Sequence, residues 1–113
     1  MSKFKEIDFE KRKKECERIM QKHKDRIPII VELNTDRDIK LDKNKYLVPH
    51  DLTMSQFMFV LRRRMKLKET DAIFCYCDNV LPPSSAIIND IYEQHKCTDG
   101  YLYVTVAFEN SFG

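Results

Sequence analysis

One continuous apolar stretch constrains the fold more than any other part of this sequence. Residues 27–33 read Ile-Pro-Ile-Ile-Val-Glu-Leu, so β-branched side chains dominate and Glu32 alone is charged. A run of this kind is typical of a strand that is buried on both faces. Pro28 fits the start of such a strand, where a missing backbone N–H is tolerated. The chain is therefore expected to build a sheet with this segment in its interior.

Residues 45–49, Lys-Tyr-Leu-Val-Pro, are the second informative stretch. Successive side chains of a strand point to opposite faces, so Tyr46 and Val48 share one face while Lys45 and Leu47 share the other. A strand this short, ended by proline and preceded by charged residues, favours the edge of a sheet. It is either an ordinary edge strand over the core or an edge that takes up an extended, acidic peptide by strand addition.

An amphipathic helix is expected over residues 9–23, after a separate short turn or helix that includes Phe4. Within the helix, the basic run Lys11–Lys14 is expected to form a solvated face, with binding to an acidic partner surface as the alternative. The apolar positions at helical spacing are Phe9, Cys16, Ile19, Met20 and His23.

A second helix is expected to start after Thr53, because Gln56 three residues later completes a capping box. Leu52 can pack onto Phe57 across this cap as a hydrophobic staple. Three arginines at residues 62–64 fall where cations suit a helix C-terminus. The predicted core stripe of this helix is Phe57, Val60, Leu61 and Met65.

The remaining elements complete an α+β pattern. Residues 72–77 and 101–108 are expected to be strands, the second of them central in the sheet. Between them, Ser84 or Ser85 is expected to cap a short helix. The order helix, strand, strand, helix, strand, helix, strand is that of the ubiquitin-like β-grasp with an N-terminal helical extension.

The length of 113 residues suits one structural domain. Within it, residues 1–24 are assigned to the N-terminal helical extension and residues 25–108 to the β-grasp core. Residues 109–113 are expected to form a flexible C-terminal tail.

Composition argues against several classes of function. Twenty Lys and Arg against eighteen Asp and Glu give a net charge of +2, which is too small to indicate nucleic acid. No apolar run approaches the ~20 residues needed to cross a bilayer. The sequence has no glycine-rich phosphate loop, no P-loop and no evident carboxylate pair, and its three histidines are scattered. The protein is therefore expected not to be an enzyme, with no catalytic residues.

The four cysteines match no zinc spacing and are expected to be reduced thiols. Cys75 and Cys77 share one face of their predicted strand and are expected to fill the core as small apolar side chains. The alternative is a metal site that they would form with Cys97 or His95. The prediction is that the protein holds no metal and needs no cofactor.

A set of short segments carries a family resemblance. They are Phe9-Glu10-Lys11-Arg12, residues 25–32, residues 42–49, residues 51–53, residues 56–57, residues 79–83, residues 101–103 and the terminal Phe112-Gly113. In this order and register they closely resemble the autophagy ubiquitin-like modifiers, whose animal members include the GABA-receptor-associated protein and the microtubule-associated light chain. The resemblance runs from about Phe9 to Gly113.

The resemblance implies a modifier that is conjugated through Gly113. In that family the terminal glycine is activated with ATP, passed as a thioester through E1-like and E2-like cysteines, and joined to the amine of phosphatidylethanolamine. A glycine without a Cβ can thread the narrow clefts of these enzymes. Phe112 is the implied recognition residue for the processing and deconjugating cysteine protease. A cytoplasmic monomer would thus move to autophagosomal or other vesicle membranes on its covalent lipid.

The resemblance also implies docking of aromatic-x-x-aliphatic peptides from cargo receptors and adaptors along residues 45–48. The implied aromatic pocket consists of Glu15, Ile19, Pro28, Ile30, Lys45, Leu47 and Tyr101. The implied aliphatic pocket consists of Tyr46, Val48, Pro49, Leu52, Phe57, Val60 and Leu61, with Arg64 at its rim. Arg26, Lys43 and Lys45 would meet acidic residues before the aromatic one, which adds mainly on-rate and orientation.

Two other functions are compatible with the same residues. One is a β-grasp module that binds peptides and is never conjugated. The other is a basic protein that binds tubulin or anionic lipid through Lys11–Lys14, with a steep dependence on salt.

Overall fold

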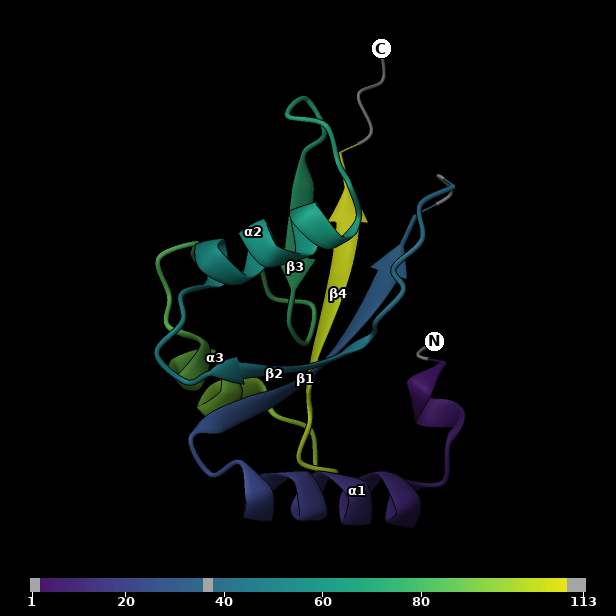
Figure 1. The fold of residues 1–113 in the computed structure, drawn as a ribbon, viewed down its shortest axis with the longest axis vertical. Coiled ribbons are helices and arrows are strands. Elements are labelled where there is room, and N and C mark those ends of the chain that lie inside the picture. The colour runs from purple at the N-terminus through teal and green to yellow at the C-terminus, as the bar shows by residue number, and fades with distance from the viewer. Residues whose placement is uncertain (1–2, 36–37, 110–113) are drawn as a thin grey trace.

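The computed structural model describes residues 3–35 and 38–109, which form one mixed four-stranded sheet with helices on both faces (Figure 1). The strand order is β2-β1-β4-β3. The central pair, β1 and β4, is parallel, and both outer pairs are antiparallel. The strands are β1 (Arg26–Asn34), β2 (Lys45–Pro49), β3 (Ile73–Tyr76) and β4 (Leu102–Phe108). The predictions that β4 is central and β2 lies at the edge are confirmed.

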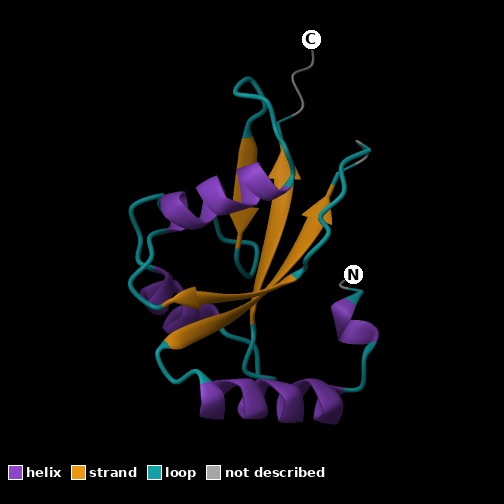
Figure 2. Ribbon diagram, viewed as in Figure 1, coloured by secondary structure: helices purple, strands orange, loops and turns teal. Residues whose placement is uncertain are grey.

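The helical elements are the 3-10 turn η1 (Phe4–Glu6), α1 (Phe9–Lys22), α2 (Met54–Arg64) and α3 (Ile88–His95). Figure 2 shows α1 on one side of the β1–β2 pair, with α2 and α3 on the other. The α+β order and the short turn before α1 match the sequence predictions.

The burial of β1 explains this layering. Its residues from Ile27 to Val31 are all buried, as expected for a strand covered on both faces. Ile29 and Val31 face the main core, which includes side chains from α2 and α3. Ile30 faces a smaller cluster that contains Phe4, Cys16 and Tyr101. Because alternate side chains of one strand enter two clusters, β1 ties η1 and α1 to the rest of the domain.

The start of α2 has the predicted capping box. The Gln56 backbone N–H donates to Thr53 Oγ1 over 3.2 Å, and the Thr53 backbone N–H donates to Gln56 Oε1 over 2.9 Å. The predicted core stripe is wrong at Val60, whose side chain is 39% exposed. Met54, Phe57 and Leu61 form the buried stripe at spacings of three and four residues, and Val60 is rotated by about 100° from Leu61.

The predicted serine cap of α3 is also wrong. The N-cap of α3 is Ile87, which makes no side-chain capping hydrogen bond. The preceding segment pairs instead with the first turn of α2, because the Ser55 backbone N–H donates to the Ser84 carbonyl and the Met54 backbone N–H to the Ala86 carbonyl. These bonds satisfy N–H groups that a helix N-terminus leaves without partners.

The third strand is shorter than the predicted residues 72–77. It ends at Tyr76, and the Cys77 backbone N–H then bonds the Val80 carbonyl over 2.8 Å in a tight turn. Asp78 and Asn79 adopt positive φ angles in that turn. Two residues in this conformation reverse the chain direction and end the ladder.

The buried face of α1 differs from the prediction as well. Phe9 is 36% exposed and His23 is exposed, whereas Arg12 is buried. Arg12 Nη1 lies 2.6 Å from Asp99 Oδ2, at the turn before β4. The prediction that the whole run Lys11–Lys14 is solvated is therefore wrong at Arg12. The helical spacing of four places Arg12 on the face of Cys16, which packs against the sheet.

Gly100 is required where α1 approaches the turn before β4. Its φ is +97°, and a Cβ built there would lie 2.7 Å from Cys16 Sγ. We expect Gly100→Ala to lower the free energy of unfolding by about 1–3 kcal/mol, measured by urea unfolding. In the background of Cys16→Ala the clash is absent and only the φ penalty is left, so the loss caused by Gly100→Ala should be smaller. Equal losses in both backgrounds would contradict the close approach.

Candidate functional site

The outer edge of β2 is the centre of the candidate site. In the part of the chain that the structure describes, β2 pairs with β1 alone. Its register places Leu47 opposite Pro28 and Lys45 opposite Ile30 on one face. On the other face, Val48 lies opposite Ile27 and Tyr46 opposite Ile29. Each face of this edge strand therefore continues into a separate group of apolar side chains.

On the α1 side, polar contacts join residues of the predicted aromatic pocket. Glu15 Oε1 accepts hydrogen bonds from Lys45 Nζ over 2.7 Å and from the Tyr101 hydroxyl over 2.6 Å. Ile19 packs against the cluster of Ile30 and Tyr101. The seven residues predicted from the family resemblance thus come from α1, β1, β2 and, for Tyr101, the position just before β4, on one side of the sheet.

The protonation states on this side follow from those contacts. Burial favours the neutral form of Glu15, but the hydrogen bonds from Lys45 and Tyr101 outweigh it and hold its pKa below the ordinary value of 4.5. Burial, followed by the hydrogen bond to Glu15, raises the pKa of Tyr101. At neutral pH Glu15 is therefore a carboxylate and Tyr101 a neutral phenol.

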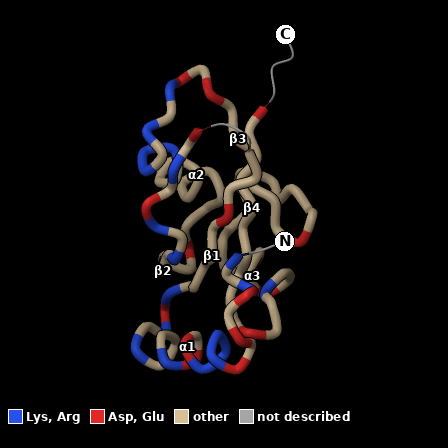
Figure 3. The backbone as a smooth tube through the Cα atoms, turned by 90° about the vertical axis from the view of Figure 1, so that its right-hand side faces the viewer, with Lys and Arg blue, Asp and Glu red and all other residues tan. Residues whose placement is uncertain are grey.

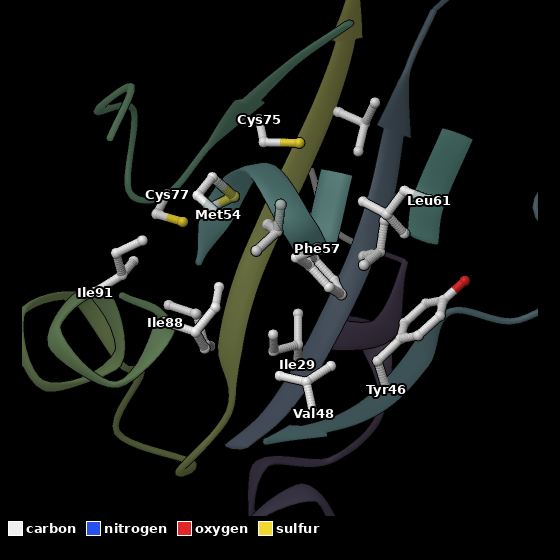
Figure 4. Packing of buried hydrophobic residues seen from close by; sticks show 14 of the residues in the cluster. Ile29, Tyr46, Val48, Met54, Phe57, Leu61, Cys75, Cys77, Ile88 and Ile91 are labelled. Carbon is white, nitrogen blue, oxygen red and sulfur yellow. The ribbon is translucent and has the colours of Figure 1, made fainter. Parts of the chain in front are cut away.

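On the α2 side, the predicted aliphatic pocket has a buried floor and an exposed rim. The rings of Tyr46 and Phe57 meet edge to face with centroids 5.7 Å apart. Phe57 and Leu61 have no exposed surface, so they form the floor (Figure 4). Val60 and Arg64 are exposed at this side, while Val48 is buried and Leu52 is half-buried. Pro49 is exposed too, but the alternation along β2 places it on the face of Lys45 and Leu47 and not with the rest of this predicted pocket.

The Tyr46 hydroxyl on the α2 side is a buried polar group that differs from its apolar neighbours. It points away from the apolar cluster in Figure 4, is buried, and has no hydrogen-bond partner among the described residues. Burial raises the pKa of Tyr46, with Asp42 acting in the same direction and Arg64 against it. The Lys43 ammonium lies 5.2 Å from the centre of its ring.

The three cations predicted to meet acidic peptide residues, Arg26, Lys43 and Lys45, are all exposed. Figure 3 shows Lys and Arg segments on the side of the molecule that carries β2, interrupted by Asp and Glu. Arg64 Nη1 lies 3.7 Å from Asp42 Oδ2, so this cation is partly neutralised. The predicted conjugation residue Gly113 and the predicted protease-recognition residue Phe112 lie outside the described residues.

Three residues that pack next to the site were not assigned to it from the sequence. Phe4 and Asp99 are buried, and Tyr103 donates a hydrogen bond to Asp99 Oδ2 over 2.5 Å. For Tyr103 alone, the sequence pattern could have predicted the position. The spacing of Tyr101 and Tyr103 along a strand places both rings on the face of Ile30, where they require covering side chains.

The cysteines show no sign of special chemistry. All four are free, and burial is the main cause that raises the pKa of Cys75 and of Cys77 to about 12. Within residues 3–35 and 38–109, no group of three or more His, Cys, Asp and Glu could hold a metal ion. None of the helices in these ranges has the length and apolar character needed to span a bilayer.

Comparison with known proteins places these features in a family. A sequence model described as "Autophagy protein Atg8 ubiquitin like" matches residues 11–113. The chain belongs to the Atg8 family. It is 56% identical over 114 residues to autophagy-related protein 8 of Cochliobolus heterostrophus, covering 99% of this chain and 96% of that protein. The Neurospora crassa relative is also 56% identical, with 99% and 94% covered.

Solved structures of Atg8 proteins confirm the ubiquitin-like fold. Trypanosoma brucei ATG8 superposes with a TM-score of 0.90 at 43% identity, covering 100% of this chain and 99% of that one. Plasmodium falciparum Atg8, solved in complex with a Plasmodium falciparum Atg3 peptide, has a TM-score of 0.84 at 28% identity, with 96% and 100% covered. The protein is thus an autophagy ubiquitin-like protein, as the resemblance implied.

Proposed function

We propose that this Atg8-family protein is joined through Gly113 to phosphatidylethanolamine on autophagosomal membranes and docks aromatic-x-x-aliphatic peptides along β2. In this proposal it is a modifier and a docking scaffold, and it catalyses no reaction itself. Its partners are the E1-like and E2-like enzymes, the processing protease, and cargo receptors and adaptors that carry the peptide motif.

The observation that carries the docking proposal is the edge position of β2 between two apolar sides. A peptide strand added to this edge would satisfy backbone groups of both chains. Its side chains would alternate, so residues at the first and fourth motif positions can turn toward different sides of the sheet. The aromatic residue would enter the side of Leu47 and Glu15, and the aliphatic residue the side of Val48 and Val60.

Charge supports the same orientation. Exposed Arg26, Lys43 and Lys45 flank the edge, so acidic residues before the aromatic one would be attracted there. The Plasmodium falciparum relative was solved with an Atg3 peptide. We extend this kind of contact to the present chain and propose that its E2-like enzyme also presents a peptide to this protein.

Conjugation is tested with purified protein, the E1-like and E2-like enzymes, ATP and liposomes that contain phosphatidylethanolamine. We expect an intact-mass gain of one phospholipid and a faster gel mobility. No gain, with enzymes shown to be active on another family member, would reject conjugation. It would leave an unconjugated peptide-binding β-grasp module as the better function.

Docking is tested by replacing Leu47, which is half-buried on β2. We expect Leu47→Ala to weaken binding of an aromatic-x-x-aliphatic peptide by roughly 1–3 kcal/mol, measured by calorimetric titration, because an apolar contact at the pocket is lost. Leu81→Ala is the matched control, since Leu81 is 51% exposed in the turn after β3. Equal affinities of the two variants would place the pocket elsewhere.

The alternative in which Lys11–Lys14 bind tubulin or anionic lipid loses support from the position of Arg12. The guanidinium is buried against Asp99, so three of the four cations are left for a partner. Glu10, Glu15 and Glu17 also lie on α1, which reduces its net positive charge. This function is therefore the weaker of the candidates.

A further inference from the structure

Phe4, in the turn η1 that precedes α1, packs against residues of the predicted aromatic pocket. Its ring meets the ring of Tyr101 edge to face with centroids 5.3 Å apart. The Lys45 ammonium lies 5.1 Å from the centre of the Phe4 ring while it also bonds Glu15. Ile30 belongs to the same buried cluster. Phe4 thus lies against three residues of the predicted aromatic pocket, Tyr101, Lys45 and Ile30, although it is far from each of them in sequence.

The burial of the pocket residues shows what Phe4 does there. Ile30 is 0% exposed and Tyr101 is 1% exposed, so an incoming ring cannot touch either side chain while the present cover is in place. The apolar cover includes Phe4, Tyr103 and the inner face of α1, which carries Cys16 and Ile19. A peptide aromatic residue that reaches Ile30 or Tyr101 must displace part of this cover, and Phe4 is the part that meets the Tyr101 ring edge to face.

Of the elements that cover the pocket, α1 and η1 are not held equally. α1 is 14 residues long and is fixed by the buried ion pair of Arg12 and Asp99. η1 is a single turn of three residues, for which a displacement breaks few backbone hydrogen bonds. A hollow of about 700 Å³ adjoins it, lined by Lys3 and Phe4 together with parts of β1 and the loop before β2. The structure therefore has room beside η1 for the ring to move.

We propose that Phe4 is an internal competitor for the aromatic pocket, which an incoming peptide must displace. The ligand that replaces Phe4 most effectively has the same chemistry, an aromatic ring that packs on Tyr101 beneath the Lys45 ammonium. Phe4 thereby selects against peptides with an aliphatic residue at the first motif position, because their side chains do not recover these contacts. This inference rests on the proposed docking function and adds to it a residue that sets affinity and specificity.

The test compares peptide binding by the wild-type protein and Phe4→Ala. The probe is a synthetic peptide, Asp-Asp-Trp-Ala-Ala-Leu, whose tryptophan gives the binding signal because the protein contains none. We expect Phe4→Ala to bind at least about tenfold tighter. A pocket that is open in about 10% of molecules or fewer lowers the apparent affinity by that factor. Phe74→Ala, which removes an exposed ring on β3 at the opposite edge of the sheet, should leave the affinity unchanged.

Unchanged or weaker binding by folded Phe4→Ala would overturn the inference, since Phe4 would then be a wall of the pocket. If that variant does not fold, the wild-type protein decides by NMR. The contacts between the Phe4 and Tyr101 rings should disappear on saturation with the peptide, and their persistence would overturn the inference. Absence of any tryptophan signal with wild type, Phe4→Ala and Phe74→Ala would instead reject the docking function itself.

Discussion

Replacing Gly113 with alanine is expected to abolish transfer of this protein to phosphatidylethanolamine. In the proposed reaction ATP activates the Gly113 carboxylate, an enzyme cysteine forms a thioester with it, and the lipid amine then displaces the thiolate to give an amide. Each transfer passes the terminal residue through a narrow cleft, which glycine enters because it has no Cβ. The measurement is intact mass after incubation with both enzymes, ATP and liposomes, where wild type gains one phospholipid and Gly113→Ala gains none.

The control for this prediction is Ser111→Ala, which changes the same C-terminal segment and retains the terminal glycine. It should be lipidated to the same extent as wild type. Because residue 113 lies beyond the last described strand, both variants should unfold at the wild-type urea concentration. Lipidation of Gly113→Ala at the wild-type rate would exclude a requirement for glycine at the conjugated position.

Replacing Arg12 with methionine is expected to lower the free energy of unfolding by about 3–5 kcal/mol, because a buried carboxylate loses its cation. The Asp99 side chain has no exposed surface. Its Oδ2 accepts hydrogen bonds from Arg12 and from the Tyr103 hydroxyl, and its Oδ1 accepts one from the Tyr101 backbone N–H over 2.9 Å. Without Arg12 the negative charge stays buried with hydrogen bonds alone. Urea unfolding followed by circular dichroism measures the loss.

Lys13→Met is the matched control for Arg12→Met. It removes the same charge and introduces the same side chain at the next position of α1, but Lys13 is exposed. Its effect should stay within about 0.5 kcal/mol, as for ordinary surface substitutions. A loss in Arg12→Met no larger than that in Lys13→Met would mean that the ion pair does not hold α1 to the sheet.

The features predictable from the sequence were those that depend on neighbouring residues. The alternation along residues 45–49 correctly placed Tyr46 and Val48 on the face opposite Lys45 and Leu47. The capping box at Thr53 was also correct, because its hydrogen bonds span only three residues. The burial of β1 on both faces could be predicted as well, because its continuous run of β-branched side chains is itself a local feature of the sequence.

The candidate site was predictable in its outline and less so in its details. Its residues were assigned from a family resemblance, and the structure places them around β2, with Pro49 on the face of Lys45 and Leu47 and apart from Tyr46 and Val48. The resemblance began at about Phe9, so it gave no role to Phe4. The exposed position of Val60 on α2 depends on which face of that helix meets the sheet, and the apolar sequence around it allowed more than one choice.

The sequence by itself determined the strand periods, the edge position of β2, the start of α2 and the family. Only the tertiary structure decided that Arg12 is buried, that Phe4 covers Tyr101, and that the segment at Ser84 pairs with α2. The physical reason is distance along the chain. Arg12 and Asp99 are 87 residues apart, and the partner that makes burial of a charge favourable exists only after the sheet has brought them together.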